Sequence, residues 1–380
     1  PIAGVLTLLL GFLAGLPASA RQVVDAAKVD EAIQAGVEAL KQLKQEQPDP
    51  RSDELVLWAL LHGGVKPDDA FFKEVLDRLL KAPLEYTYNA ALQAMVLERV
   101  DRILHQPRIY ECAQFLADNQ CQDGLWSYGQ PTKPLNPPLP PAPKKTSGTQ
   151  AVRRVRVTPR PMSVNNSGRD NSIDTGDFSN TQFAALGIRA CHDAGMDFPK
   201  DFLAKARDAW IEGQYSGPPS VKKGGVAQQP AKGGANSSPR GWGYMRTGHE
   251  ERDYPPFGSM TAGAVGSVVI YDFLLGIDWK RDPAVVSGMA WLGAHFSPSE
   301  NPEHKDRRHI WFHYYLYSIE RAGALFGTEQ MGSHDWYAEG ADVLLKTQRG
   351  GSWSDSGAGG QKIQDTSFAI LFLSRATRPL

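Results

Sequence analysis

The feature that most constrains this chain is a short turn that recurs between segments of helical periodicity. A Gln, a polar gap, a Gly and a Trp follow one another in residues 120–126 and again in residues 348–353. A third copy is split, because Gln214 closes one helical segment and Gly241 with Trp242 follows 27 residues later. Recurrence of one turn is typical of a repeat fold, in which each unit buries its apolar face against its neighbours.

Twelve segments carry apolar residues at helical spacing from residue 29 onward. They cover residues 29–45, 52–62, 69–81, 86–105, 107–119, 178–194, 199–215, 259–276, 283–296, 309–326, 333–347 and 365–376. No alternating run of β-branched residues interrupts them, so the predicted fold class is all-α. The formal net charge of −1 gives no sign of a nucleic-acid partner.

Two stretches depart from this pattern and are expected to be flexible insertions. Residues 131–170 are rich in Pro and basic side chains, and residues 216–240 are rich in Gly, Ser, Pro and Lys. Such basic segments could contact an anionic cell-envelope polymer or lipid, or they could be solvated linkers.

The spacing of the Trp residues indicates the length of the repeat. Trp126 and Trp242 are 116 positions apart, and 51 remain when the insertions of 40 and 25 residues are left out. Trp242 and Trp353 are 111 positions apart, close to two further periods. A repeat of about fifty residues holds two helices, so the twelve segments predict six helical hairpins in a single domain, residues 21–380.

The residues of the turn have a physical role in such a repeat. Gly permits a tight exit from a helix, and the indole ring can cover the end of the preceding helix. The Gln amide can bond backbone groups of the loop that would otherwise lack partners. We therefore expect a buried Trp and a Gln bound to the loop in each copy.

The first twenty residues are typical of an export signal. A Leu-rich run is followed by Ala18, Ser19 and Ala20, the small-residue pattern after which signal peptidase cuts. We expect residues 1–20 to be a cleaved signal peptide and the protein to be soluble in the periplasm or cell envelope, with an anchor or a buried helix as alternatives. The odd set of Cys112, Cys121 and Cys191 predicts no disulfide framework, although the first two could pair.

Six helical hairpins with Gln, Gly and Trp turns resemble the α/α toroid of the terpenoid cyclases and protein prenyltransferases, the prenyltransferase and squalene oxidase repeat. Residues 314–321, 334–337 and 365–373 are similar to a bacterial branch of exported repeat proteins. The resemblance implies an (α/α)6 toroid: odd helices outside, even helices inside, and a central cavity for a prenyl or polyprenyl chain. Segments 178–194 and 259–276 agree with an inner position, because they are nearly uncharged and rich in small residues.

In such a ring the N-termini of six inner helices meet at one rim, where free N–H groups and helix dipoles favour a binding site. Asp174 and Asp177 lie at the start of the sixth segment. They resemble the outer carboxylates of the Asp-x-Asp-Asp of class II terpene cyclases, whose middle Asp protonates an alkene or epoxide. Gly176 stands at that middle position, so Asp177 is the candidate catalytic acid, with a helix N-cap as its other interpretation.

The tenth segment is unusually aromatic and is the candidate lining of the cavity. Its side chains could stabilise carbocations through their ring faces or simply pack the core. They are His309, Trp311, Phe312, His313, Tyr314, Tyr315 and Tyr317. Asn180, Gln182 and Asp365 complete the candidate substrate contacts. Asp335 and Asp365 are also suited to capping helices, and Glu320 and Arg321 to pairing with neighbouring repeats.

No cofactor or metal site is expected. Protein prenyltransferases bind zinc through Asp, Cys and His, but Asp177 and Cys191 are 14 residues apart on one helix, a separation of about 20 Å. His309 and His313 are spaced i, i+4 on one predicted helix face, which suits a metal but supplies no third ligand. Nucleophile-elbow, phosphate-loop, His-Glu-x-x-His and thioester motifs are absent.

The resemblance leads to two main hypotheses and a weaker third. The first is an exported terpenoid cyclase-like enzyme acting on a polyisoprenoid, with Asp177 as its acid. The second is a catalytically silent ring that binds a lipid, a peptide or a cell-envelope partner. The third is an (α/α)6 carbohydrate-active enzyme, which would need two carboxylates facing each other at the rim.

Overall fold

The computed structural model describes residues 24–131, 157–164, 175–215, 238–246, 255–304, 309–354 and 361–380. Twelve α-helices dominate this part of the chain, and the prediction of an all-α fold is confirmed. The helices are α1 (Ala26–Glu46), α2 (Asp53–His62), α3 (Ala70–Leu79), α4 (Thr87–Asp101), α5 (Gln106–Asp118), α6 (Phe178–Asp193), α7 (Lys200–Glu212), α8 (Gly258–Leu275), α9 (Pro283–His295), α10 (Phe312–Phe326), α11 (Trp336–Thr347) and α12 (Lys362–Leu373). A 3-10 turn, η1 (Pro50–Ser52), precedes α2. The predicted signal segment and most of the two predicted insertions lie outside the described residues.

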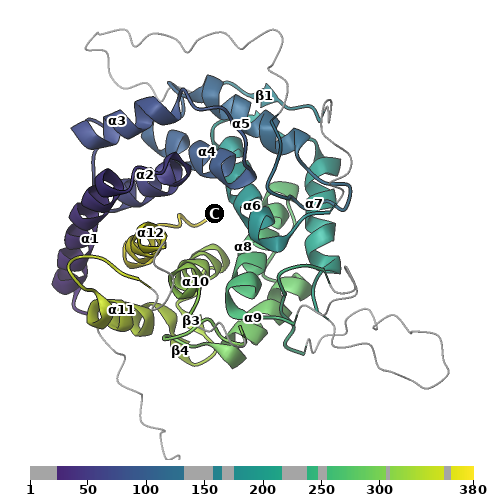
Figure 1. Ribbon diagram of the computed structural model, residues 1–380. Helices are drawn as coiled ribbons and strands as arrows, with labels where there is room; N and C mark the ends of the chain where they lie inside the picture. Colours follow the sequence, from purple (N-terminus) through teal and green to yellow (C-terminus); the bar gives the residue numbers. More distant parts are fainter. Residues whose placement is uncertain are drawn as a thin grey trace, which may run out of the picture.

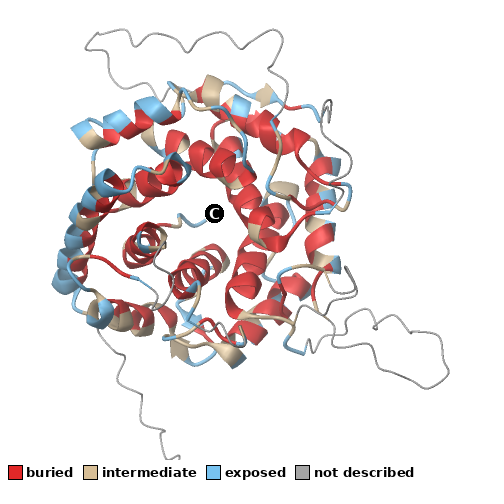
Figure 2. Ribbon diagram, in the orientation of Figure 1, coloured by how far each residue is buried: buried red, intermediate tan, exposed pale blue. Residues whose placement is uncertain are grey.

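The even-numbered helices lie inside the odd-numbered ones (Figure 1). Contacts run from α2 through α4, α6, α8 and α10 to α12, and α12 in turn contacts α2. The even-numbered helices are buried around most of their surface, whereas α1 and α3 expose one face (Figure 2). Of the described helices, α8 alone is long and apolar enough to cross a membrane, yet 83% of that segment is buried in the fold. Its composition is therefore that of a core helix.

Four two-residue strands accompany the helices in the part of the chain that the structure describes. β1 (Arg160–Pro161) pairs in parallel with β2 (Met196–Asp197), and β3 (Gln330–Met331) pairs antiparallel with β4 (His334–Asp335). β1 falls inside the predicted insertion 131–170, where we expected no ordered structure. The backbone N–H of Arg160 donates to the carbonyl of Gly195 (2.8 Å), and Met162 is buried beside it. This part of the insertion therefore packs against the chain that follows α6.

The three Trp turns are built alike and confirm the predicted role of the indole. Each ring is fully buried and donates its N–H to a carbonyl of the preceding odd-numbered helix. The pairs are Trp126 with Leu116 (2.8 Å), Trp242 with Trp210 (2.7 Å) and Trp353 with Leu344 (2.9 Å). The backbone N–H of each Trp donates to a Thr hydroxyl on the next even-numbered helix: Thr181, Thr261 and Thr366.

The Gln of each turn joins two hairpins. Its amide donates to a carbonyl of its own turn and to a second carbonyl on the next odd-numbered helix. The acceptors are Gly124 and Phe202 for Gln120, Arg240 and Ala284 for Gln214, and Gly351 and Ala32 for Gln348. Because Ala32 lies on α1, Gln348 connects the last hairpin of the chain to the first.

Candidate functional site

A cavity of about 780 Å³ lies at the N-terminal ends of the even-numbered helices. All six of these helices contribute to its wall, through Leu55, Tyr88, Phe183, Met260, Tyr314 and Phe368 in helix order. The sequence predicted a site where these helix ends meet, and the cavity lies at that place. The dipoles of these helices add a partial positive charge near the cavity.

Aromatic rings form much of the cavity wall. Phe183 stacks on Tyr314 with ring centroids 6.2 Å apart, and Tyr314 lies 5.3 Å from Phe368. Tyr88 meets the edge of Phe183 at 5.9 Å, and Trp311 meets Tyr314 at 6.3 Å. These rings come from α4, α6, α10, α12 and the turn before α10, so a ligand in the cavity is enclosed by apolar faces on several sides.

The predicted catalytic acid is a helix cap. Asp177 is the N-cap of α6: one carboxylate oxygen accepts from the backbone N–H of Asn180 and the other from its side-chain amide, both at 2.8 Å. Burial raises the pKa of Asp177, and the bonds from Asn180 and the N–H of Ser179 oppose that rise. Asp177 is not among the residues that line the cavity, whereas Asn180 is. Asp174 lies outside the described residues.

Steric crowding explains why position 176, just before Asp177, is a glycine. A Cβ on Gly176 would lie 2.5 Å from the backbone nitrogen of Trp126. The N–H of Asp177 also donates to the carbonyl of Trp126 (3.0 Å), so the Trp turn is in direct contact with this segment. An aspartate cannot replace Gly176 here unless that turn moves.

Only some of the aromatic residues before and within α10 line the cavity. Trp311 and Tyr314 line the cavity as predicted, but Phe312 and His313 do not. Tyr317 does not line it either, and its hydroxyl accepts from the indole N–H of Trp58 (3.1 Å). Tyr315 is also buried and off the cavity wall; its hydroxyl accepts from the N–H of Ser297.

Two predictions about helix ends were wrong. His309 precedes α10, because the backbone of Trp311 takes a left-handed φ of 63° and the helix begins at Phe312, so His309 and His313 do not share a helix face. Asp365 is not a cap, because α12 begins three residues earlier at Lys362. Asp365 is buried, with one carboxylate oxygen 3.5 Å from Nδ1 of His313. Asp335 caps α11 as predicted, accepting from the N–H of Ala338.

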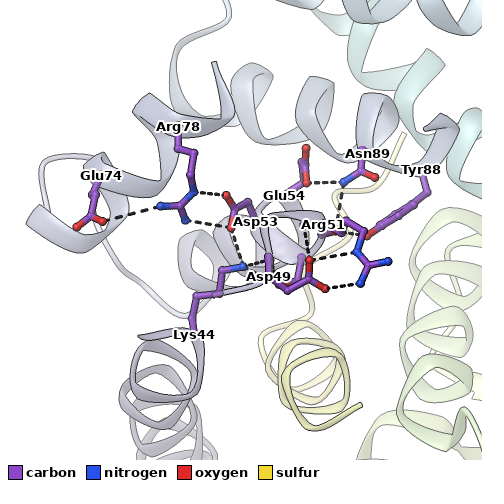
Figure 3. Close-up of polar contacts among 10 residues, drawn as sticks. Lys44, Asp49, Arg51, Asp53, Glu54, Glu74, Arg78, Tyr88 and Asn89 are labelled. Atoms are coloured by element: carbon purple, nitrogen blue, oxygen red, sulfur yellow. Dashed lines mark hydrogen bonds and ion pairs between the residues drawn. The ribbon is translucent and has the colours of Figure 1, made fainter. Parts of the chain in front are cut away.

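The start of α2, which carries two residues of the cavity wall, is held by a buried ion-pair network (Figure 3). The ammonium of Lys44, only 1% exposed, lies 2.7 Å from one oxygen of Asp53. Arg78 donates to both oxygens of Asp53, at 2.7 and 3.1 Å. Lys44 also donates to the hydroxyl of Ser52 (2.7 Å) and to the carbonyl of Asp49. These bonds fix Ser52 and Leu55 at the cavity.

A second buried carboxyl lies behind the wall. Glu54 on α2 accepts from the side-chain amide of Asn89 on α4 (2.6 Å), and the hydroxyl of Tyr88 donates to the carbonyl of Arg51 (Figure 3). Burial raises the pKa of Glu54 to about 7, partly offset by the bond from Asn89. The contacts hold the Tyr88 ring against the cavity.

Sequence reasoning missed the cavity residues that come from turns: Tyr128, Tyr244, Phe257, Glu303 and His304. A signal for two of them was present. Tyr128 and Tyr244 each follow a motif Trp by two positions. Their carbonyls accept the N–H groups of Thr87 and Phe178, the first residues of α4 and α6. A Trp-x-Tyr turn therefore places a phenol ring beside the start of an inner helix.

The cysteines and histidines do not gather into a site. Among the described residues no group of three His, Cys, Asp or Glu side chains could hold a metal ion. Cys112, Cys121 and Cys191 are buried, and Cys112 and Cys121 form no disulfide with each other. Burial raises the pKa of Cys112 to about 12, which keeps that thiol protonated and unreactive.

A smaller cavity of about 430 Å³ lies at the other end of the inner helices, where the last residues of the chain cross it. Arg189 on α6 donates to the carbonyls of Arg378 and Pro379, at 2.8 and 2.9 Å. Glu320 on α10 is fully buried and accepts from the N–H (2.9 Å) and hydroxyl (2.7 Å) of Thr377. The C-terminal segment is thus fastened to two inner helices.

Glu320 is expected to make the protein less stable as the pH rises. Burial raises its pKa from 4.5 to about 7, so the folded protein holds a proton that the unfolded chain releases. Its stabilising contribution is complete below pH 4.5 and is lost as the pH rises through 7, by up to about 3 kcal/mol. Urea unfolding between pH 5 and 8 should show a shallower fall in Glu320→Gln than in the wild type. Parallel pH profiles would contradict this assignment.

Comparison with known proteins adds no family to these observations. No family model matches the chain, and a search of curated protein sequences also found no match. The geometry of the cavity at the inner helix ends therefore carries the functional argument.

Proposed function

We propose that the chain is an exported (α/α)6 toroid of the terpenoid cyclase and prenyltransferase type that binds an isoprenoid or similar apolar chain without cyclising it. The observation that carries this proposal is the aromatic cavity at the N-terminal ends of the six even-numbered helices. Its volume of about 780 Å³ falls within the 300 to 1,000 Å³ typical of small-molecule pockets. The predicted basic insertions, most of which lie outside the described residues, are proposed to contact the cell envelope.

The residues around the cavity favour binding over cyclisation, because they engage the candidate catalytic acid and place a positive charge nearby. Both oxygens of Asp177 are engaged by Asn180, and Gly176 leaves no room for the missing acid. The guanidinium of Arg321 lies 4.2 Å from the centre of the Tyr317 ring. That ring face is therefore occupied, and a fixed positive charge in a low-dielectric core opposes a carbocation nearby.

A carbohydrate-active enzyme receives less support. Glycoside hydrolysis generally uses two carboxylates on opposite sides of the scissile bond. Among the described residues that line the cavity, Glu303 is the one carboxylate. Asp365 and Glu54 are buried behind the wall, and neither lines the cavity.

Calorimetric titration with geranylgeraniol should detect binding, and maltohexaose should give no signal. Trp311 is 40% exposed and lines the cavity, so Trp311→Ala should fold normally and bind geranylgeraniol about tenfold more weakly. Trp279→Ala, which alters a Trp away from the cavity, serves as the matched control and should bind as the wild type does. Absence of geranylgeraniol binding, or equal affinity in the two variants, would refute the proposal.

A further inference from the structure

Three buried hydrogen-bond donors on and behind the cavity wall lack an acceptor. They are Nη1 of Arg321, Nε2 of Gln182 and the hydroxyl of Tyr314, and none has a partner within the described residues. The three side chains are 2%, 1% and 7% exposed. Buried donors without acceptors are costly, and such groups are rare in folded proteins. Their convergence calls for an acceptor that the chain itself does not supply.

The three donors belong to one cluster. Nη2 of Arg321 on α10 donates to Oε1 of Gln182 on α6 (2.6 Å) and to the hydroxyl of Ser318 (2.9 Å). The bond to Oε1 fixes the orientation of the amide, so Nε2 is the atom that remains free. Gly263 on α8 makes room for this amide, because a Cβ there would lie 2.3 Å from Oε1.

The cluster adjoins the cavity. Tyr314 and Ser179 both line the cavity, and the Tyr314 hydroxyl lies near the side chains of Ser179 and Gln182. The guanidinium carbon of Arg321 is 5.8 Å from the ring centre of Phe183 and 5.9 Å from that of Tyr314. Both rings are part of the cavity wall. The guanidinium of Arg321 is therefore next to two side chains of the cavity wall.

The charge of Arg321 is not balanced by a directly bound carboxylate. None of the ion pairs among the described residues includes Arg321. The carboxylate of its sequence neighbour Glu320 accepts from Thr377 with both oxygens. A buried guanidinium is stable when an anion meets it with good geometry, so the site favours a negatively charged acceptor.

We propose that this cluster is a carboxylate subsite, and that the ligand of the cavity is an apolar chain ending in a single carboxylate that points inward to Arg321. This inference rests on the proposed function and specifies the ligand class. A carboxylate is acceptor-only, and its two oxygens can satisfy three donors. One guanidinium balances one negative charge, whereas a phosphate dianion would bring a second charge into the core without a cation to match it.

The test is calorimetric titration of the full chain at pH 8 with dodecanoate, dodecan-1-ol and dodecyl phosphate. We expect dodecanoate to bind at least about tenfold more tightly than the other two. Arg321→Met should bind dodecanoate and dodecan-1-ol equally. Tyr314→Phe keeps the ring and removes one donor, so it should reduce the preference for dodecanoate several-fold. Tyr271→Phe removes another buried hydroxyl without a partner, on α8 and away from the cavity, and should leave the preference unchanged.

The outcomes separate this inference from the proposed function. Equal binding of dodecanoate and dodecan-1-ol by the wild type refutes the carboxylate subsite and leaves apolar binding intact. Tighter binding of dodecyl phosphate also refutes it. Binding of none of the three probes refutes the proposed function itself. If Arg321→Met does not fold, Tyr314→Phe decides, because an unchanged preference in that variant overturns the subsite.

Discussion

Replacing Asp53 by alanine is expected to destabilise the protein by about 3 to 5 kcal/mol, the range measured when one partner of a buried ion pair is removed. Asp53 is 3% exposed at its side chain and accepts from both Lys44 and Arg78. Without it, Arg78 can still reach water because it is 41% exposed, but the ammonium of Lys44 stays buried. The energetic cost therefore arises mainly from Lys44, and chemical denaturation monitored by circular dichroism measures it.

A double-mutant cycle tests that cause. Lys44→Met added to Asp53→Ala removes the stranded charge and should restore a large part of the lost stability. Asp342 forms an exposed pair with Lys346, so Asp342→Ala is the matched control and should cost less than about 1 kcal/mol. Strictly additive costs of the Lys44 and Asp53 substitutions would contradict the network. The binding of geranylgeraniol should also weaken in Asp53→Ala, because Ser52 and Leu55 lose their fixed position.

The helices could be predicted from sequence because each carries its own apolar periodicity and, in several cases, its own cap. Asp69, Asp177, Asp282 and Asp335 all accept backbone N–H groups at the starts of helices, where their residue type alone suggests a cap. The start of α10 could not be predicted in the same way. Trp311 adopts a left-handed conformation that its residue type disfavours, so only the surrounding fold determines it.

The place of the site was predictable, but its chemistry was not. The meeting of inner helix ends follows from the hairpin repeat, and Trp311, Tyr314 and Asn180 lie at the cavity as expected. The role proposed for Arg321 depends on contacts that sequence spacing cannot reveal. Its partner Gln182 is 139 residues away, whereas the sequence predicted for Arg321 only a pairing with a neighbouring repeat.

Replacing Trp353 by alanine is expected to cost about 3 to 5 kcal/mol, as for other fully buried aromatic residues. The indole bonds to the carbonyl of Leu344 on α11 and packs so closely on α1 that a Cβ at Gly36 would lie 2.9 Å from the ring. Trp353 therefore contributes to the contact between the last hairpin and the first. A typical domain is stable by 5 to 15 kcal/mol, so thermal unfolding should begin at a clearly lower temperature.

Hydrogen exchange distinguishes a local loss of contact between the last hairpin and the first from a general destabilisation of the protein. In Trp353→Ala, amide exchange should accelerate most in α1 and α11, the helices that the ring contacts. Trp126→Ala removes an equivalent indole between α5 and α6 and should spare α1, which makes it the matched control. Gln348→Leu leaves the carbonyls of Ala32 and Gly351 without that donor and should cost a smaller amount, about 1 to 3 kcal/mol. Identical exchange patterns in the two Trp variants would show that neither turn acts locally.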